Sequence, residues 1–268
     1  MTDTTRGTGR HGSRNRRAQP LNLDRRIVAC ALVLGCLAGP AWAQAPAGCP
    51  VSSTHVTAFQ PLEHSRAAVQ RGRLTVLAVG SSSIEGVGAS SPQRGFVPLL
   101  EAGLERRLPG IEVTVINRGI GGETTRDTEG RIPLQTSLTV PDVVVWQWGT
   151  NDVLRDRPTG DVVADFRRGA DWLDRAGVDV LLIDPQRLPE DTDNPGFKGR
   201  NPSLAAMART IADEARTRGY AVLARHAAMA DWGALPGGGV GPDDLQLNDD
   251  GYACWAENTA EGLATALR

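Results

Sequence analysis

The sequence predicts a three-layer α/β domain, in which helices cover both faces of a parallel β-sheet. Three observations carry this prediction: five short apolar runs rich in β-branched residues, apolar residues at helical spacing between these runs, and glycines directly after the expected helices. Continuous apolar runs are typical of strands that are buried on both faces. Strands that alternate with helices are typical of a parallel sheet with a helical layer on each side.

The expected elements follow one another along the chain. Strands are expected at 74–79, 111–116, 143–148, 178–183 and 220–223. Apolar residues at helical spacing predict helices over 96–108, 162–173, 204–215 and 252–267. Gly110, Gly177 and Gly219 follow three of these helices, where a residue with positive φ commonly ends a helix. Two stretches rich in Gly, Pro and Asp, 184–202 and 233–251, are expected to be loops.

Two tryptophans lie in the third expected strand. Trp146 and Trp148 alternate with Gln147, so both indoles point to the same face of the sheet. We expect them in the core, and a platform that stacks on sugar rings is the alternative.

The first 43 residues predict a secretory signal peptide. Seven arginines precede residue 27, an apolar run extends from Ile27 to Leu37, and Ala41-Trp42-Ala43 has the pattern of a cleavage site. We expect cleavage after Ala43 and a secreted or periplasmic protein. Lipid attachment at Cys36 is an alternative, and Arg25-Arg26 weakly resembles a twin-arginine signal. Residues 44–70 are expected to form an extended lead-in to a domain over 71–268.

Composition excludes several classes of protein. A chain that is 40% hydrophobic and 22% charged can bury a core and is not disordered. A net charge of -2 gives no basic footprint for nucleic acid. No apolar run has the length of about 20 residues that crosses a bilayer. We expect neither a metal nor a cofactor, since no His/Cys/Asp cluster has ligand spacing and the P-loop lysine is missing.

Two cysteines remain after the expected cleavage, Cys49 and Cys254. In an oxidising compartment such a pair predicts one disulfide, which would tie the start of the mature chain to its last helix. Two buried free thiols are the alternative.

Small polar residues follow three of the expected strands. The first is followed by Gly80-Ser81-Ser82-Ser83-Ile84, the second by Asn117 to Thr125, and the third by Gly149-Thr150-Asn151-Asp152. A fourth polar segment, Asp243 to Asn248, precedes the last helix. In an open parallel sheet ligands bind beyond the carboxyl ends of the strands, so these segments are expected to converge. Taken singly, each also has a structural interpretation, as a tight turn, a flexible loop or an Asx turn.

Together the four segments resemble the SGNH/GDSL hydrolases, a family of serine esterases and acylhydrolases, over nearly all of 71–268. The resemblance implies a flavodoxin-like fold with a five-stranded parallel sheet in the order 2-1-3-4-5. It implies that Ser82 is the nucleophile and that Asp243 is the catalytic acid. The N–H groups of Ser82 and Gly122 and the side-chain amide of Asn151 would form the oxyanion hole.

Two positions depart from the family pattern. Ser81 stands where the family has an aspartate, and Gln246 stands where it has the catalytic histidine. A carboxamide accepts no proton near neutral pH, so Gln246 cannot act as the base. His226, after the fifth strand, is the possible substitute base, whereas His55 and His64 lie in the lead-in.

The expected function is therefore an exported ester hydrolase for small acyl or acetyl esters, with acylated carbohydrate among the candidate substrates, and with catalysis impaired by Gln246. One alternative is a catalytically silent protein that binds an acylated or glycan ligand in the same cleft. Another is a structural envelope protein.

Overall fold

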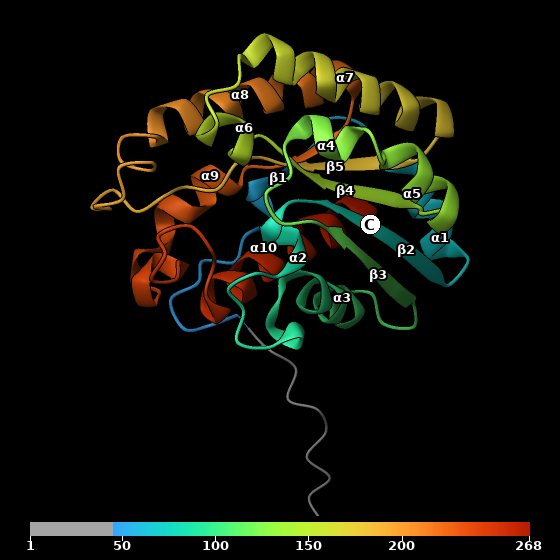
Figure 1. Cartoon of the computed structure of the whole chain (residues 1–268). Helices are drawn as coiled ribbons and strands as arrows, with labels where there is room; N and C mark the ends of the chain where they lie inside the picture. Colours follow the sequence, from blue (N-terminus) through green and yellow to red (C-terminus); the bar gives the residue numbers. More distant parts are fainter. Residues whose placement is uncertain (1–44) are drawn as a thin grey trace, which may run out of the picture. The chain divides into compact units, whose positions relative to one another are not determined.

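The computed structural model describes residues 45–268, and the expected signal peptide, including Cys36, lies outside the described residues. Its centre is a six-stranded sheet in the order β1-β6-β5-β4-β2-β3 (Figure 1). The strands are β1 (Val56–Ala58), β2 (Arg73–Gly80), β3 (Glu112–Gly119), β4 (Val143–Gln147), β5 (Asp179–Ile183) and β6 (Ala221–Leu223). Strands β2 to β6 are parallel and have the order 2-1-3-4-5 among themselves, which confirms the predicted fold class.

The lead-in is not simply extended, as the sequence analysis expects for residues 44–70. Within it, β1 pairs antiparallel with β6, and the helix α1 (Glu63–Gln70) follows. The N–H of Ser65 in α1 donates to Asp179 of β5 at 2.7 Å, which attaches the helix to the sheet. A three-residue edge strand and a helix that buries few apolar residues carry too little periodicity to be recognised in the sequence.

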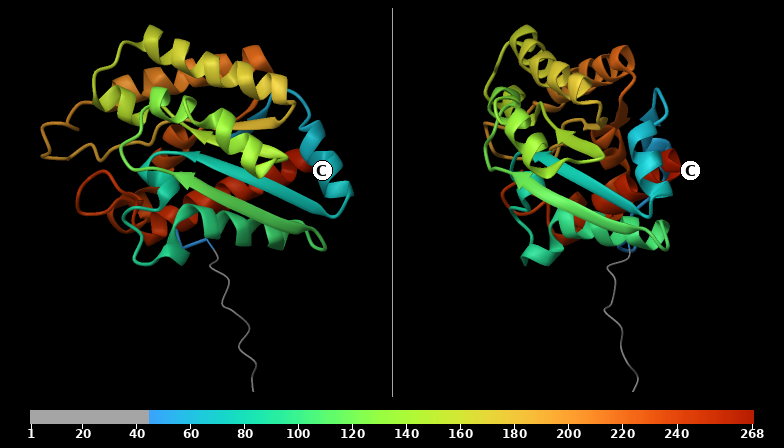
Figure 2. Two further views of the ribbon diagram at one scale, coloured as in Figure 1. Left: turned by 45° about the vertical axis from the view of Figure 1, so that its right-hand side comes forward. Right: turned by 90° about the vertical axis from the view of Figure 1, so that its right-hand side faces the viewer.

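Each face of the sheet is covered by two long helices (Figure 2). Leu74, Val76 and Ala78 of β2 share one core with α3 (Phe96–Arg107) and α10 (Asp249–Leu267). The alternating residues Leu77 and Val79 share the other core with α7 (Thr159–Ala176) and α8 (Asn201–Arg218). The alternation follows from the two-residue period of a strand and makes both sheet faces apolar.

The remaining helices are short and lie in the connections between these elements. They are η1 (Ser53–His55), α2 (Ser82–Glu85), η2 (Pro92–Arg94), α4 (Thr125–Glu129), α5 (Ile132–Thr139), α6 (Thr150–Leu154), α9 (Arg225–Ala228), η3 (Met229–Ala234) and η4 (Pro236–Gly239). Of these, α2, α4 and α6 begin shortly after the ends of β2, β3 and β4, and so position the polar segments at the carboxyl edge of the sheet.

The two tryptophans, Trp146 in β4 and Trp148 just after it, belong to the core, as the sequence predicts. Trp146 and Trp148 are 0% and 2% exposed, and both rings pack on Phe166 of α7, with centroid distances of 5.1 and 4.5 Å. Because both indoles are buried, neither offers a surface on which a sugar ring could stack.

The predicted disulfide is confirmed. Cys49 and Cys254 are bonded, with 5.5 Å between their Cα atoms, and Cys254 lies fully buried in α10. The bond therefore ties the start of the described chain to its last helix. Within residues 45–268, no helix has both the length and the apolar character needed to span a bilayer.

Candidate active site

The first polar segment is a tight turn from β2 into α2. Gly80 ends the strand with a φ of 150°, and a Cβ there would lie 2.8 Å from the carbonyl oxygen of Gln147, so only glycine fits. The N–H and the hydroxyl of Ser81 both donate to Gln147 Oε1, at 3.1 and 3.0 Å. The next residue, Ser82, is partly exposed at the start of α2. Within the described chain the hydroxyl of Ser82 makes no hydrogen bond, unlike those of Ser81 and Ser83.

The second polar segment lies directly against this turn. A Cβ on Gly119, at the end of β3, would lie 2.1 Å from the backbone nitrogen of Glu85, so the two backbones are in close contact. A Cβ on Gly121 would lie 4.0 Å from the Cβ of Ser82. The N–H of Gly121 donates to Glu85 Oε2 at 2.6 Å. The loop that carries Gly122 is therefore held beside Ser82.

The third polar segment is attached to the second. The side-chain amide of Asn151, in α6, donates to the carbonyl of Glu123 at 2.8 Å. The buried carboxylate of Asp152 accepts the N–H and the hydroxyl of Thr125, the first residue of α4, and pairs with Arg157 at 2.6 Å. Asp152 therefore joins two loops. The amide of Asn151 has two donor hydrogens, and its bond to Glu123 uses one of them.

The fourth polar segment is a turn closed by its own aspartate. Asp243 Oδ1 accepts the N–H groups of Leu245 and Gln246, at 3.1 and 2.8 Å. A Cβ on Gly88, in the loop after α2, would lie 2.8 Å from the Cβ of Gln246. The structure thus brings the Gln246 turn next to the loop that follows Ser82, and all four predicted segments meet at the carboxyl edge of the sheet.

A buried glutamine joins the Ser82 turn to this last turn. Gln186, 2% exposed, accepts the Ser83 hydroxyl at 3.3 Å and donates through Nε2 to the carbonyl of Leu245. Ser83 and Leu245 directly adjoin Ser82 and Gln246 in the sequence, so Gln186 links the segments that carry these two residues. The sequence analysis missed Gln186 because it lies in a stretch interpreted only as a loop. Its position three residues after β5, at the edge where ligands bind, is the signal that could have identified it.

His226 belongs to a buried cluster with Asp184 and Arg225. Its backbone N–H donates to Asp184 Oδ1 at 2.8 Å, and within residues 45–268 its Nε2 is buried without a partner. Burial, and then the charges of Arg187 and Arg225, lower the pKa of the imidazole. Within the same residues no hydrogen bond connects His226 with Ser82, and its role as a substitute base stays a prediction.

Asp184, in the same cluster, should make stability depend on pH. Burial raises its pKa to about 7, despite the N–H of His226 and the charge of Arg225. Because the ordinary value is 3.8, the folded state holds this proton more tightly than the unfolded chain does. The resulting stabilisation is complete below about pH 4 and is lost as the pH rises through 7.

Asp184→Asn removes this titration. The wild type should therefore lose stability relative to Asp184→Asn as the pH rises from 4 to 8. The difference between their free energies of unfolding should decrease by at most about 4 kcal/mol. Urea unfolding of both proteins at several pH values measures the difference. A difference that stays constant over this range contradicts the assignment.

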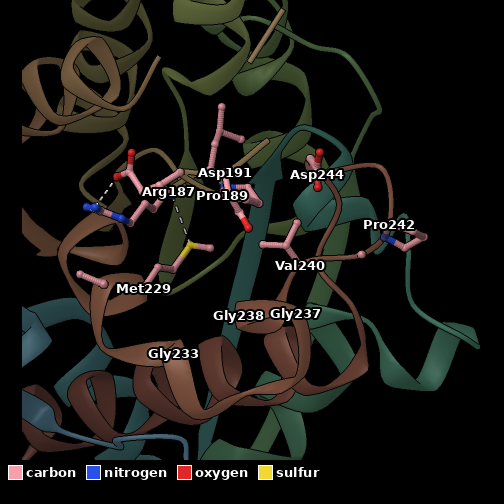
Figure 3. Close-up of a pocket in the computed structure, with 14 residues that line it drawn as sticks. Arg187, Pro189, Asp191, Met229, Gly233, Gly237, Gly238, Val240, Pro242 and Asp244 are labelled. Carbon is pink, nitrogen blue, oxygen red and sulfur yellow. Dashed lines mark hydrogen bonds and ion pairs between the residues drawn. The ribbon is translucent and has the colours of Figure 1, made fainter. Parts of the chain in front are cut away.

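A cavity of about 600 Å³ adjoins the Gln246 turn (Figure 3). Pro242 and Asp244, on either side of Asp243, line one side of it, and Arg187, next to Gln186, lines another. Arg187 pairs with Glu190 at 2.5 Å, and its N–H contacts the sulfur of Met229. Ser82 is not among the residues that line the cavity.

Comparison with protein families identifies the relatives of the chain. Residues 48–237 match the model of the non-GDSL lipase-like family, which is more than half of the chain. The chain belongs to this family. The match includes the segments of Ser82, Gly122 and Asn151 and ends before the Asp243–Gln246 turn.

Two curated esterases resemble parts of this lipase-like chain. It is 30% identical to the esterase TesA of Pseudomonas aeruginosa over 120 residues, which are 45% of this chain and 58% of the esterase. It is 31% identical to an arylesterase of Vibrio mimicus over 74 residues, which are 28% of this chain and 37% of that protein. The matches thus span between about a third and three fifths of the relatives' lengths, and they show homology to hydrolases that act on ester bonds.

Solved structures share the fold of this lipase-like protein. The crystal structure of TesA superposes with a TM-score of 0.59 at 23% identity, over 72% of this chain and 99% of that one. A two-domain esterase active on acetylated mannans superposes with a TM-score of 0.62 at 20% identity, over 81% of this chain and 57% of that one. These similarities confirm the α/β fold and its mainly parallel sheet.

No metal centre is formed in the part of the chain that the structure describes. Residues 45–268 contain no group of three or more His, Cys, Asp or Glu side chains placed to hold an ion. Gly121 lies beside Ser82, and its N–H binds the Glu85 carboxylate.

Proposed function

We propose that the protein is an exported serine ester hydrolase that acts on small acyl or acetyl esters, with acetylated carbohydrate as its substrate class. We further propose that it is slow, because Gln246 stands where the SGNH/GDSL family has its catalytic histidine. Ser82 is the nucleophile, Asp243 is the family's acid, and Ser82, Gly122 and Asn151 supply the oxyanion donors.

The observation that carries this proposal is the meeting of three strand ends around Ser82. A Cβ on Gly121 would lie 4.0 Å from the Cβ of Ser82, and Asn151 is bonded to the loop that carries Gly122. Within residues 45–268 the N–H groups of Ser82 and Gly122 make no hydrogen bond, so both are available to a ligand. Preorganised donors of this kind stabilise the tetrahedral intermediate, and the loss of one typically costs about 10² to 10³ in rate.

The substrate class is supported by the relatives and by the cavity. One structural neighbour is an esterase active on acetylated mannans. The cavity beside the Asp243 turn carries Arg187, Glu190, Asp191 and Asp244, whose side chains suit the hydroxyl groups of a sugar. Export is supported by the sequence of residues 1–43, and by the disulfide, which forms and persists in oxidising compartments.

The hydrolysis of p-nitrophenyl acetate and of acetylated oligosaccharides by the purified protein tests the proposal. We expect slow turnover by the wild type, a loss of activity to the level of buffer in Ser82→Ala, and a reduction of about 10² to 10³ in Asn151→Ala. Both variants should fold, and Ser82→Ala should keep the wild-type thermal midpoint, whereas Asn151→Ala also loses the hydrogen bond to Glu123. Equal rates for the wild type and Ser82→Ala would rule out catalysis through Ser82.

A second candidate function is favoured by Gln246. A site with a nucleophile and oxyanion donors but no imidazole could bind an acylated or glycan ligand without turning it over. In that case acetylated oligosaccharide should bind the wild type, and no Ser82-dependent product should appear in the same assay.

A further inference from the structure

The carboxylate of Glu85 lies beside the nucleophile. Glu85 follows Ser82 by three residues in α2, and residues at this spacing share one face of a helix. A Cβ on Gly121 would lie 3.0 Å from Glu85 Oε2 and 4.0 Å from the Cβ of Ser82, so both side chains border the same point. Glu85 is an exposed residue, and its carboxylate is therefore not sealed off from the site.

The segment that follows Glu85 contacts the last helix. The Tyr252 hydroxyl, in α10, donates to the carbonyl of Val87 at 2.7 Å, two residues after Glu85. Burial raises the pKa of the Tyr252 phenol, and the negative charges of Asp243 and Glu85 raise it further, against the charge of Arg225.

We propose that Glu85 is the general base that accepts the proton of Ser82 in this protein. The inference rests on the proposed hydrolase function. Two observations favour it: Gln246 carries no basic group, and within residues 45–268 no hydrogen bond joins His226 to Ser82. A carboxylate within direct or water-mediated reach of a hydroxyl can act as its base. It is ordinarily a weaker base than imidazole, which fits slow turnover.

The proton is returned in each half of the reaction. As the Ser82 oxygen bonds to the acyl carbon, its proton passes to the Glu85 carboxylate and the carbonyl becomes an oxyanion. The oxyanion collapses, the ester C–O bond breaks, and the leaving alcohol takes the proton from Glu85. Water then attacks the acyl-Ser82 ester and gives a proton to Glu85. When this second intermediate collapses, the departing Ser82 oxygen takes that proton and the acid is released.

The observed contact of Glu85 gives the competing explanation, which is a structural one. Its Oε2 accepts the N–H of Gly121 at 2.6 Å, and this bond alone could be its role in holding the loop beside Ser82. Glutamine keeps an oxygen that can accept this N–H but has no basicity, whereas alanine removes both. Comparison of Glu85→Gln with Glu85→Ala therefore separates a role as the base from a role that consists only of the hydrogen bond to Gly121.

The experiment measures kcat for p-nitrophenyl acetate in the full chain, for Glu85→Gln and Glu85→Ala, each alone and combined with Gln246→His. Glu112→Gln, an exposed glutamate on β3, is the matched control and should keep the wild-type rate. We expect Glu85→Gln to lower kcat by at least about 10²-fold. In the Gln246→His background the same change should matter less than about threefold, because imidazole then accepts the proton.

Several results would overturn the inference. If Glu85→Gln keeps its activity while Ser82→Ala is inactive, Glu85 serves only to accept the N–H of Gly121. An equal loss in both backgrounds indicates a structural role. By contrast, equal rates for the wild type and Ser82→Ala would mean that no turnover depends on Ser82, which contradicts the proposed function itself. The rate at which a fluorophosphonate modifies Ser82 is a second measurement on the same variants. No deacylation step contributes to this rate.

Discussion

Replacing Gln246 by histidine should raise Ser82-dependent ester hydrolysis by about 10² to 10⁴-fold, the usual contribution of a general acid–base residue. Imidazole can accept the proton of the nucleophile at neutral pH and then donate it to the leaving alcohol, whereas a carboxamide can do neither. The gain adds to whatever rate the wild type has through a weaker base.

The Gln246 turn can accept this change. Asp243 Oδ1 accepts two backbone N–H groups of the turn, and within the described chain Oδ2 accepts none, so it remains free for the Nδ1–H of an imidazole. Gln246 is only partly buried, which leaves space for the ring.

Two double variants serve as controls for this gain. Gln246→His with Ser82→Ala should be inactive. Gln246→His with Asp243→Asn should lose most of the gain, because asparagine can still close the turn but carries no charge to stabilise the imidazolium. A folded Gln246→His protein with wild-type activity would show that the rest of the site is incomplete.

Removal of the disulfide should cost about 5 kcal/mol of stability in the chain-entropy model. The bond joins Cys49 to Cys254 across 205 residues, so it constrains nearly the whole described chain when this unfolds. A domain is typically stable by about 5 to 15 kcal/mol, so this loss is a large fraction of the total. It should also release the segment before β1 from α10.

Urea unfolding of the wild type and of Cys49→Ala/Cys254→Ala measures this cost. Wild-type protein treated with a reductant is the matched control and should resemble the double variant. A loss below about 1 kcal/mol would mean that the reduced unfolded chain is already as restricted as the oxidised one.

The sheet was predictable because its central strands are buried on both faces. Runs such as 74–79 and 143–148 are apolar but for one residue each, and this signal is strong in a single sequence. The edge strand β1 carries no such signal, since its three residues are partly or fully exposed. Likewise α4 and α5 lie in a connection whose only pattern in the sequence is a run of small polar residues.

The segments of the site were predictable, but their connections were not. Gly-rich and hydroxyl-rich turns at strand ends identify Ser82, Gly122 and Asn151 as candidates, because a parallel sheet brings these ends together. The partners of Gln186 and Glu85 depend on which loops touch, and no local pattern encodes such contacts. His226 follows a strand on the same edge, and its backbone N–H is bound to the buried Asp184.

The central claim is that Ser82 is a nucleophile beside oxyanion donors. Labelling with a fluorophosphonate tests this claim most directly. The reagent forms a bond from the serine oxygen to phosphorus with loss of fluoride, and needs no deacylation. Intact mass and peptide mapping of the full chain should show one adduct, on Ser82, which is absent from Ser82→Ala and slower to form in Asn151→Ala. An unmodified wild type, or an adduct that persists in Ser82→Ala, would contradict the account.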